Sequence, residues 1–430
     1  MKRIRNLLVS VTLLLSIFVL SSCVASGQSS VQSAGDYMTR EEVEALIQGI
    51  EENVTVNAGN NYDISIDSGA NQNLLAASKG LLSAVSIKCK FKVTVTYTSL
   101  FGQSTQTYTT EKETAGAGVI YKLDKEKGDA YVITNYHVVY YSGADTADDI
   151  SDEISLYLYG QEYSEYAIAA EYIGGSKNYD IAVLKVKSSD VLRESNARAV
   201  DFANSDKVCV LDTAIAIGNP EAVGISATVG AVNVDSENLV MTAIDGVGQI
   251  TLRVMRIDAA VNGGNSGGGL FDDNGNLIGI VNAKMSSSSI DNIGYAIPSN
   301  VAKNVADNII YYDNEDAKND SVKRILIGVN VGINSAGTYY DTETGRVHKV
   351  EEVRIDSVTA GGLSDGKLFK GDILKSVSID GETYSITRTY NVIDVMLNAR
   401  RTSEVVFVVV RGGAEVEVKI DLSSAPLTDY

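Results

Sequence analysis

The amino-acid sequence predicts a mostly β protein in which residues 81–298 form closed antiparallel barrels. This region contains many short apolar and β-branched runs, which are separated by Gly, Asn and Asp without helical periodicity between them. The whole chain has 38 Gly, only 3 Pro and no Trp, a composition that suits strands joined by tight turns. The expected strands cover residues 85–97, 118–121, 131–134, 154–158, 181–186, 214–217 and 277–282.

The length and composition predict several folded domains. The chain has 430 residues, of which 44% are hydrophobic, enough for two or three packed cores. We expect one β domain over 81–312, ending in an amphipathic helix that begins at Ser299, and a second strand-rich domain over 324–424. The net charge of −19 would repel nucleic-acid phosphates, so nucleic acid is excluded as a partner.

The first residues have the pattern of an export signal. Lys2, Arg3 and Arg5 precede an apolar run over 7–20, which is shorter than the roughly 20 residues that a spanning helix needs. Leu20-Ser-Ser-Cys23 resembles the lipobox of bacterial lipoproteins, in which the Cys is acylated. We therefore expect a lipoprotein signal peptide over 1–22, a lipid anchor on Cys23 and a folded part outside the cytoplasm. An ordinary cleaved signal or an uncleaved anchor is the alternative.

Residues 23–80 are expected to form a flexible stalk with one short helix. The Ser, Gly, Gln and Ala content up to Asp36 cannot support a core. Thr39-Arg-Glu-Glu42 matches a capping box and precedes apolar residues at helical spacing, which predicts a helix to about Glu52.

Cysteine and histidine usage limits the possible chemistry. Beyond Cys23 the chain has only Cys89 and Cys209, both in apolar strand-like runs, which favours buried free thiols and leaves open whether they pair. The only histidines are His137 and His348, so a His-rich metal site is excluded, and we expect no metal or cofactor.

Ser266 lies in a run of glycines, Val261-Asn-Gly-Gly-Asn-Ser-Gly-Gly-Gly-Leu270. Glycine permits sharp turns and leaves backbone N–H groups uncovered, as an oxyanion hole requires. Gly264-Asn-Ser-Gly-Gly268 also fits the G-x-S-x-G turn of α/β-hydrolases, so this fragment alone leaves two enzyme folds open. A glycine turn with an idle Ser is the alternative without catalysis.

Chain order separates the two enzyme folds. An α/β-hydrolase needs a His after the Ser, and the only one is His348, on what the pattern predicts to be a solvated hairpin. The chymotrypsin order of His, Asp and Ser is met by His137, Asp180 and Ser266. Asp180 begins an apolar strand, where a carboxylate buried without a partner would be costly, so an imidazole N–H is a fitting partner. A structural His and a solvated Asp are the alternatives. All three fragments in this order predict a catalytic triad.

The protease part of the chain resembles the HtrA (high-temperature-requirement A) family of trypsin-like proteases with PDZ domains. The resemblance rests on Thr134-Asn-Tyr-His-Val-Val139, Tyr179-Asp-Ile-Ala-Val-Leu184, Ala216-Ile-Gly-Asn-Pro220, Asp258-Ala-Ala-Val-Asn262, Gly264-Asn-Ser-Gly-Gly268 and Gly294-Tyr-Ala-Ile-Pro298. It implies a chymotrypsin-like double antiparallel β-barrel, an oxyanion hole formed by the N–H groups of Gly264 and Ser266, and a trimer.

Three residues near the nucleophile bear on control of the site. Gly263 and Gly269 stand where the family usually has Pro, and we expect them to loosen the oxyanion turn. Asn265 is neutral, whereas digestive trypsin-like enzymes have an Asp there that pairs with a newly cut N-terminus. No zymogen clipping is therefore expected, and activity should depend on loop ordering, oligomerisation or peptide binding.

Substrate recognition is predicted at two places. Ile280, Val281, Asn282 and Ala283 are expected to form one wall of the pocket, and the absence of an acid there favours small or aliphatic side chains, as in the family.

The C-terminal part resembles a PDZ domain, through Ile325-Leu-Ile-Gly328, Gly371-Asp-Ile-Leu374 and the Arg411-Gly-Gly413 hairpin. Ile325, Leu326, Ile327 and Gly328 are expected to receive a peptide C-terminus by β-addition, opposite a helix over 390–401.

The sequence thus predicts an HtrA-like serine endopeptidase that cleaves misfolded or exported proteins at the outer face of the cell membrane. The alternative is a PDZ-bearing binding or chaperone-like protein whose protease site is rarely competent.

Overall fold

The computed structural model describes residues 72–98, 105–220, 224–283, 293–315 and 321–430. The signal segment, Cys23 and the helix expected after Thr39 lie outside these residues. Within them, no helix combines the length and apolar character needed to cross a bilayer.

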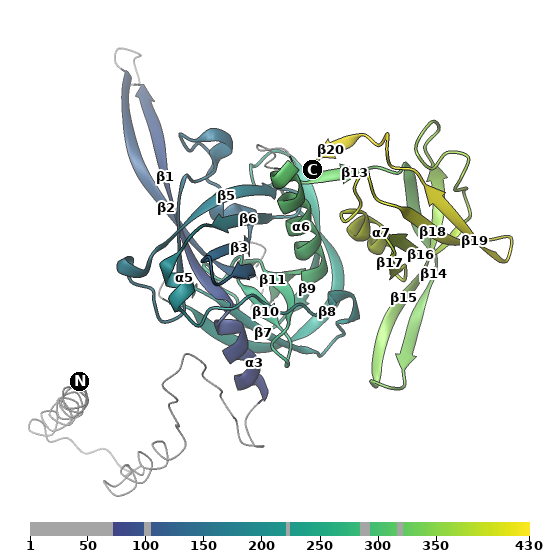
Figure 1. The fold of residues 1–430 in the computed structure, drawn as a ribbon, viewed down its shortest axis with the longest axis horizontal. Coiled ribbons are helices and arrows are strands. Elements are labelled where there is room, and N and C mark those ends of the chain that lie inside the picture. The colour runs from purple at the N-terminus through teal and green to yellow at the C-terminus, as the bar shows by residue number, and fades with distance from the viewer. Residues whose placement is uncertain (1–71, 99–104, 221–223, 284–292, 316–320) are drawn as a thin grey trace, which may run out of the picture. The chain divides into compact units, whose positions relative to one another are not determined.

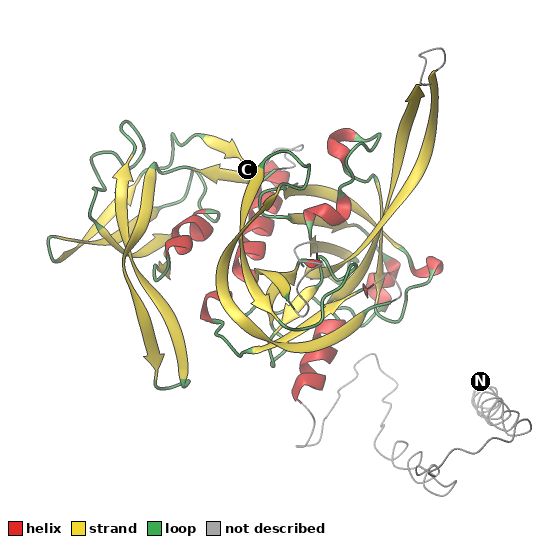
Figure 2. Ribbon diagram, turned by 180° about the vertical axis from the view of Figure 1, so that it is seen from behind, coloured by secondary structure: helices red, strands yellow, loops and turns green. Residues whose placement is uncertain are grey.

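Six strands close into the first barrel. They are β1 (Ala84–Thr98), β2 (Thr105–Asp124), β3 (Asp129–Thr134), β4 (Glu153–Leu158), β5 (Ile168–Ser176) and β6 (Ile181–Val186), in the order β1-β2-β3-β6-β5-β4. On β1, Ile87, Cys89 and Phe91 are buried while the lysines between them are exposed, as the period of two requires. β1 and β2 continue past the barrel as a two-stranded arm (Figures 1 and 2).

Six further strands close into the second barrel. They are β7 (Thr213–Gly218), β8 (Ser226–Thr242), β9 (Gln249–Ile257), β10 (Gly269–Phe271), β11 (Leu277–Val281) and β12 (Gly294–Pro298), in the order β10-β11-β12-β9-β8-β7. Met255, Leu270 and Ile278 fill its interior. The prediction of a mostly β protein with closed antiparallel barrels is confirmed.

Two helices cover the barrels. α3 (Gln72–Leu81) packs on β7 and β10 and buries Ala76, so the part of the expected stalk after residue 71 is instead a helix attached to the barrel. α6 (Ser299–Glu315) contacts β5 and β6 of the first barrel and β11 and β12 of the second (Figure 1). Val301, Val305 and Ile309 form its buried face, as their spacing of four residues predicts.

The C-terminal part has a sheet and one helix around its own core. The strands β14 (Val329–Asp341), β15 (Arg346–Val358), β16 (Ile373–Ile379), β18 (Val405–Arg411) and β19 (Ala414–Ile420) lie in this order, with β17 (Glu382–Ser385) beside β16. α7 (Thr389–Met396) is shorter than the expected helix. A separate two-stranded sheet pairs β13 (Lys323–Ile325) with β20 (Leu427–Asp429).

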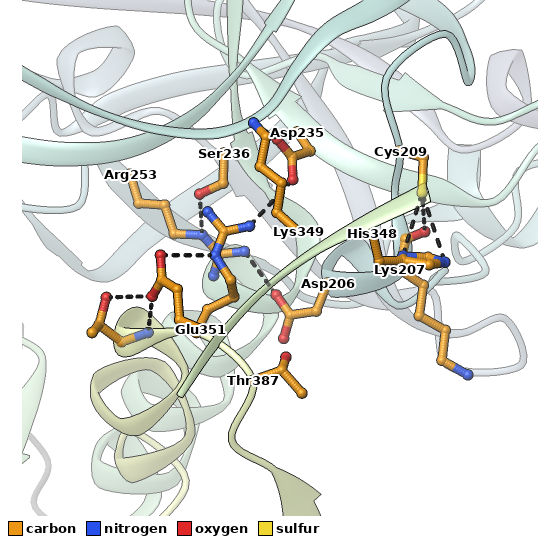
Figure 3. A network of polar contacts seen from close by, with 12 residues as sticks. Asp206, Lys207, Cys209, Asp235, Ser236, Arg253, His348, Lys349, Glu351 and Thr387 are labelled. Atoms are coloured by element: carbon orange, nitrogen blue, oxygen red, sulfur yellow. Dashed lines mark hydrogen bonds and ion pairs between the residues drawn. The ribbon is translucent and has the colours of Figure 1, made fainter. Parts of the chain in front are cut away.

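A polar network joins the C-terminal domain to the second barrel (Figure 3). Arg253 of β9 pairs with Asp206 and with Asp394 of α7. Burial raises the pKa of Asp394 to about 6, although the charge of Arg253 acts in the opposite direction. His348 lies on the hairpin of β14 and β15, whose residues 346, 347 and 349 are exposed, as predicted. His348 itself is partly buried at this interface, with Nδ1 3.4 Å from the sulfur of Cys209.

Candidate active site

The two barrels each supply part of the predicted triad. His137 lies in the short helix α4 (Tyr136–Val139), which follows β3, and Asp180 directly precedes β6, so both belong to the first barrel. Ser266 lies in the connection between β9 and β10 of the second barrel. His137 and Ser266 are 129 positions apart in the sequence and come from different barrels.

Asp180 and His137 form a two-point contact. One carboxylate oxygen of Asp180 lies 2.8 Å from His137 Nδ1, and the other accepts the His137 backbone N–H at 3.0 Å. The Asp180 side chain is 1% exposed, so these donors replace the water that it loses. Its φ of +49° is a conformation that non-glycine residues rarely adopt and that is common at functional sites.

Two asparagines donate hydrogen bonds to Asp180. Asn282 Nδ2 donates to the same carboxylate oxygen that faces His137, at 2.6 Å, and Asn135 Nδ2 donates to the Asp180 backbone carbonyl at 2.8 Å. Both asparagines are fully buried. Sequence reasoning missed these contacts, although Asn135 lies within the motif that contains His137.

Ser266 is held close to the pair but is not joined to it. Its Oγ accepts a hydrogen bond from the Ala283 N–H at 3.1 Å, and its carbonyl accepts one from the Ala117 N–H at 2.8 Å. Across the residues that the structure describes, no hydrogen bond connects Ser266 Oγ with His137. The hydroxyl of Ser266 is therefore hydrogen-bonded to a backbone N–H of its own barrel.

The turn before Ser266 leaves backbone donors open. The Asn265 N–H closes a turn on the Asn262 carbonyl at 3.0 Å, with Gly264 at φ +94°, which favours glycine. Among the described residues, the N–H groups of Gly264 and Ser266 have no acceptor. Gly269 is the first residue of β10, where it pairs with Ile217 and Ile280, so the expectation that it loosens this turn is wrong. Gly263 does lie in the turn, where it is exposed.

Comparison with known proteins agrees with this geometry. Residues 116–280 match the model of the trypsin-like peptidase domain. The chain is 34% identical over 234 residues to the serine protease Do-like HtrA of Bacillus subtilis (strain 168), a match that covers 54% of this chain and 46% of that protein. It is 31% identical over 308 residues to the probable periplasmic serine endoprotease DegP-like of Chlamydia trachomatis, covering 70% of this chain and 53% of that protein. The chain contains a trypsin-like peptidase domain and is similar to HtrA serine proteases.

The match to HtrA proteins is partial in length. The chain spans about half the length of these two relatives. Among solved structures, the HtrA-type protease AlgW with decapeptide is 25% identical, with a TM-score of 0.48 and coverage of 84% of this chain and all of that one.

The residues expected to form one wall of the substrate pocket lie mostly inside the barrel. Ile280 and Val281 are fully buried in two hydrophobic clusters, and Asn282 faces Asp180. Only Ala283 is partly accessible. Alternation on β11 directs Ile280 and Val281 to opposite faces, each into its own apolar cluster, and Asn282 contacts Asp180, so these three side chains are buried.

The predicted peptide-binding site in the C-terminal part is a groove. Ile325, Leu326, Ile327 and Gly328 line a cavity of about 250 Å³. Its other wall is α7, through Val392, Ile393 and Met396. β14, which follows Gly328, is the edge strand of the C-terminal sheet. The groove thus lies between a helix and an open strand edge.

The thiols and metal-binding groups add no further centre. Cys89 and Cys209 are both free and buried, and burial raises the pKa of Cys89 to about 12, so it is inert as a thiolate near neutral pH. In the part of the chain that the structure describes, no group of three or more His, Cys, Asp and Glu residues could hold a metal ion.

Proposed function

We propose that the chain is a serine endopeptidase in which Ser266 is the nucleophile, His137 the general base and acid, and Asp180 the residue that orients His137. The observation that carries the proposal is the contact of His137 Nδ1 with the buried Asp180 carboxylate, which leaves His137 Nε2 for Ser266. Similarity to HtrA serine proteases and the trypsin-like peptidase domain support the same reaction.

The reaction proceeds through an acyl-enzyme. His137 Nε2 takes the Ser266 hydroxyl proton as Oγ bonds to the substrate carbonyl carbon, and the proton then passes to the leaving amine as the C–N bond breaks. His137 then deprotonates a water molecule, whose oxygen bonds to the acyl carbon. The bond between this carbon and Ser266 Oγ breaks, and His137 returns the proton to Oγ. Asp180 remains ionised and stabilises the imidazolium.

Two backbone donors would stabilise the oxyanion. The N–H groups of Gly264 and Ser266 have no acceptor among the described residues and are available to a substrate oxygen. Removal of one such donor typically costs about 10²–10³ in rate. For the substrate we propose misfolded or exported proteins, cleaved beside small or aliphatic residues.

A second function is favoured by one observation. Ser266 Oγ accepts the Ala283 N–H and forms no hydrogen bond with His137 in the described structure. A PDZ-bearing binding or chaperone-like protein with a rarely competent site would have such a resting state. An apo protease would have it too if substrate binding turned the Ser266 hydroxyl toward His137.

Cleavage of casein separates these functions. The full chain should hydrolyse casein, and the matched Ser266→Ala chain should not. Equal turnover by both would overturn the endopeptidase, and suppression of casein aggregation without cleavage by either would favour the binding function.

For the C-terminal part we propose a PDZ domain over 324–424 that binds peptide C-termini. The groove beside Gly328 and the open edge of β14 support β-addition, with α7 as the opposite wall. A labelled apolar peptide should bind with a free C-terminus and not when amidated. Ile393→Lys should weaken binding, since Ile393 is exposed in the groove. Equal binding of both peptides would contradict this site.

For the cellular location we propose an extracytoplasmic protease, anchored by a lipid on Cys23 after removal of residues 1–22, with a protease domain over 81–312. The signal pattern and the periplasmic DegP-like relative support export. Cys23→Ala should release the chain from the membrane fraction. The trimer remains part of the proposal and is checked by light scattering of the purified chain.

A further inference from the structure

Residues 427–430 reach from the C-terminal domain to the neighbourhood of the catalytic acid. β20 (Leu427–Asp429) pairs with β13, whose last residue, Ile325, begins the groove-lining segment. Tyr430 continues this pairing, because its N–H donates to the Val322 carbonyl at 2.9 Å. Val322 is fully buried in the cluster that also contains Ile181 of β6.

Tyr430 makes two contacts beyond this sheet and one ring contact within it. Its carbonyl oxygen accepts a hydrogen bond from Ser176 Oγ at 2.7 Å. Its ring lies 5.1 Å from that of Tyr179, and the guanidinium of Arg324 lies 4.1 Å from its ring centroid. Tyr430, which is 39% exposed, thus lies between β13 and the connection from β5 to β6.

This connection sets the backbone of Asp180. Ser176 Oγ accepts the Tyr179 N–H at 3.3 Å, so the hydroxyl that holds Tyr430 also shapes the turn 176–179. Tyr179 directly precedes Asp180, which is held at φ +49°. The Tyr179 hydroxyl is buried without a hydrogen-bond partner, so ring packing and the backbone fix this residue. A shift of the Tyr179 ring would move the Asp180 carboxylate.

Asp429, which precedes Tyr430, fixes the segment 427–430 through side-chain hydrogen bonds. Asp429 accepts hydrogen bonds from Ser321 Oγ at 2.6 Å and from Lys323, and these two donors hold its pKa below its ordinary value. Gly175, which precedes Ser176, forms a parallel bridge with Ser321. Ser321 therefore contacts both residues 427–430, through Asp429, and the end of β5 that leads to Asp180, through Gly175.

We propose that Tyr430 is a positioning residue of the protease, and that residues 427–430 clamp the turn 176–179 so that Asp180 meets His137. The inference rests on the proposed endopeptidase function. It assigns the C-terminal domain a structural part in the catalytic centre. Because the clamp acts on the acid and not on the substrate site, its loss should lower kcat and leave KM unchanged.

The test compares Tyr430→Ala with Tyr430→Phe in the full chain. Tyr430→Phe keeps the ring and the backbone contacts, so it should retain wild-type kcat, whereas Tyr430→Ala should lose about 10- to 100-fold. Tyr340→Ala, which removes an exposed tyrosine elsewhere in the same domain, is the matched control and should change nothing.

A second measurement needs no turnover. The chain has only two histidines, so ¹⁵N-histidine labelling gives one catalytic and one remote ring signal. Tyr430→Ala should broaden or shift the His137 Nδ1 proton, which contacts Asp180, and leave His348 unchanged. His348 lies at the interface with Cys209, so its signal reports whether the C-terminal domain remains docked.

The outcomes are distinct. Unchanged kcat and an unchanged His137 signal in Tyr430→Ala would overturn the clamp, as would an equal loss in Tyr430→Phe or a simultaneous shift of His348, which would indicate undocking. A wild-type chain without protease activity would overturn the proposed function alone, since the His137 signal would still test the clamp.

Discussion

The two barrels have the same strand order but present their catalytic groups in different states. The first barrel holds His137 and Asp180 already joined, through contacts of 2.8 and 3.0 Å. The second barrel holds Ser266 on the Ala283 N–H, apart from His137. The contact between His137 and Asp180 therefore lies within one barrel, whereas contact between Ser266 and His137 depends on two barrels.

This difference indicates where the site can be regulated. The buried Asp180 has donors on both carboxylate oxygens, and small movements would cost hydrogen bonds. The Ser266 hydroxyl needs only to rotate away from Ala283, and its turn contains exposed Gly263. We expect substitutions in the first barrel to abolish the preformed pair and those in the second to alter how readily the nucleophile is recruited.

The largest effect should come from Asp180→Asn in the preformed half. The amide cannot hold the same His137 tautomer, so kcat should fall by about 10⁴ with little change in KM. Steady-state cleavage of a peptide substrate gives both constants. A fall of less than tenfold in a chain with unchanged circular dichroism would show that Asp180 does not orient His137.

The second barrel offers a matched glycine pair. Gly264→Ala should lower kcat by about 10²–10³, because alanine is strained at φ +94° and the oxyanion donor would turn away. Gly263→Ala should retain activity, since its added Cβ meets no atom within 4 Å. Similar losses in both variants would contradict the assignment of Gly264 to the oxyanion hole.

A smaller effect is expected from Asn282, which belongs to the second barrel but supports the acid of the first. Asn282→Leu should lower kcat about tenfold, which corresponds to about 1.4 kcal/mol for one hydrogen bond to a carboxylate. The matched variant is Asn304→Leu, because Asn304 is another buried asparagine, whose amide donates to the Asp394 carbonyl. Equal kcat in the two variants would remove Asn282 from the catalytic centre.

The smallest effect should be on stability alone. Asp307 of α6 accepts hydrogen bonds from Tyr121 and Lys122 of the first barrel and from Lys303. Burial alone would raise the Asp307 pKa, but these donors outweigh it and lower the pKa. A lowered pKa stabilises the fold above pH about 4 and ceases to do so as the pH falls through the folded value.

Asp307→Asn should therefore reduce the free energy of unfolding by about 1–2 kcal/mol at pH 7. The difference from wild type should begin to shrink below pH about 4, where the carboxylate of the unfolded chain becomes neutral, and be smallest once the native carboxylate is also neutral at a lower pH. Urea unfolding at both pH values measures this. A constant difference would show that Asp307 contributes by packing rather than by charge.

The sequence predicted what local patterns encode. The short apolar runs predicted closed antiparallel barrels, and chain order selected the proposed triad, because His137 is the only His before Ser266. It did not predict contacts that depend on which side of a strand faces a neighbour. Asn282 appeared to be a pocket residue until its strand register placed it on Asp180. Tyr430 gave no signal at all, since its partners lie more than 100 residues earlier, at Arg324, Tyr179 and Ser176.

Labelling with a fluorophosphonate tests the central claim most directly, because this reagent reacts with a serine only when its base and oxyanion donors are in place. Intact mass and peptide mapping of the treated chain should show one adduct, located on Ser266. Ser266→Ala should abolish it and His137→Ala should slow it strongly. A wild-type chain without an adduct, or an adduct that persists in Ser266→Ala, would contradict the assignment of Ser266 as the nucleophile.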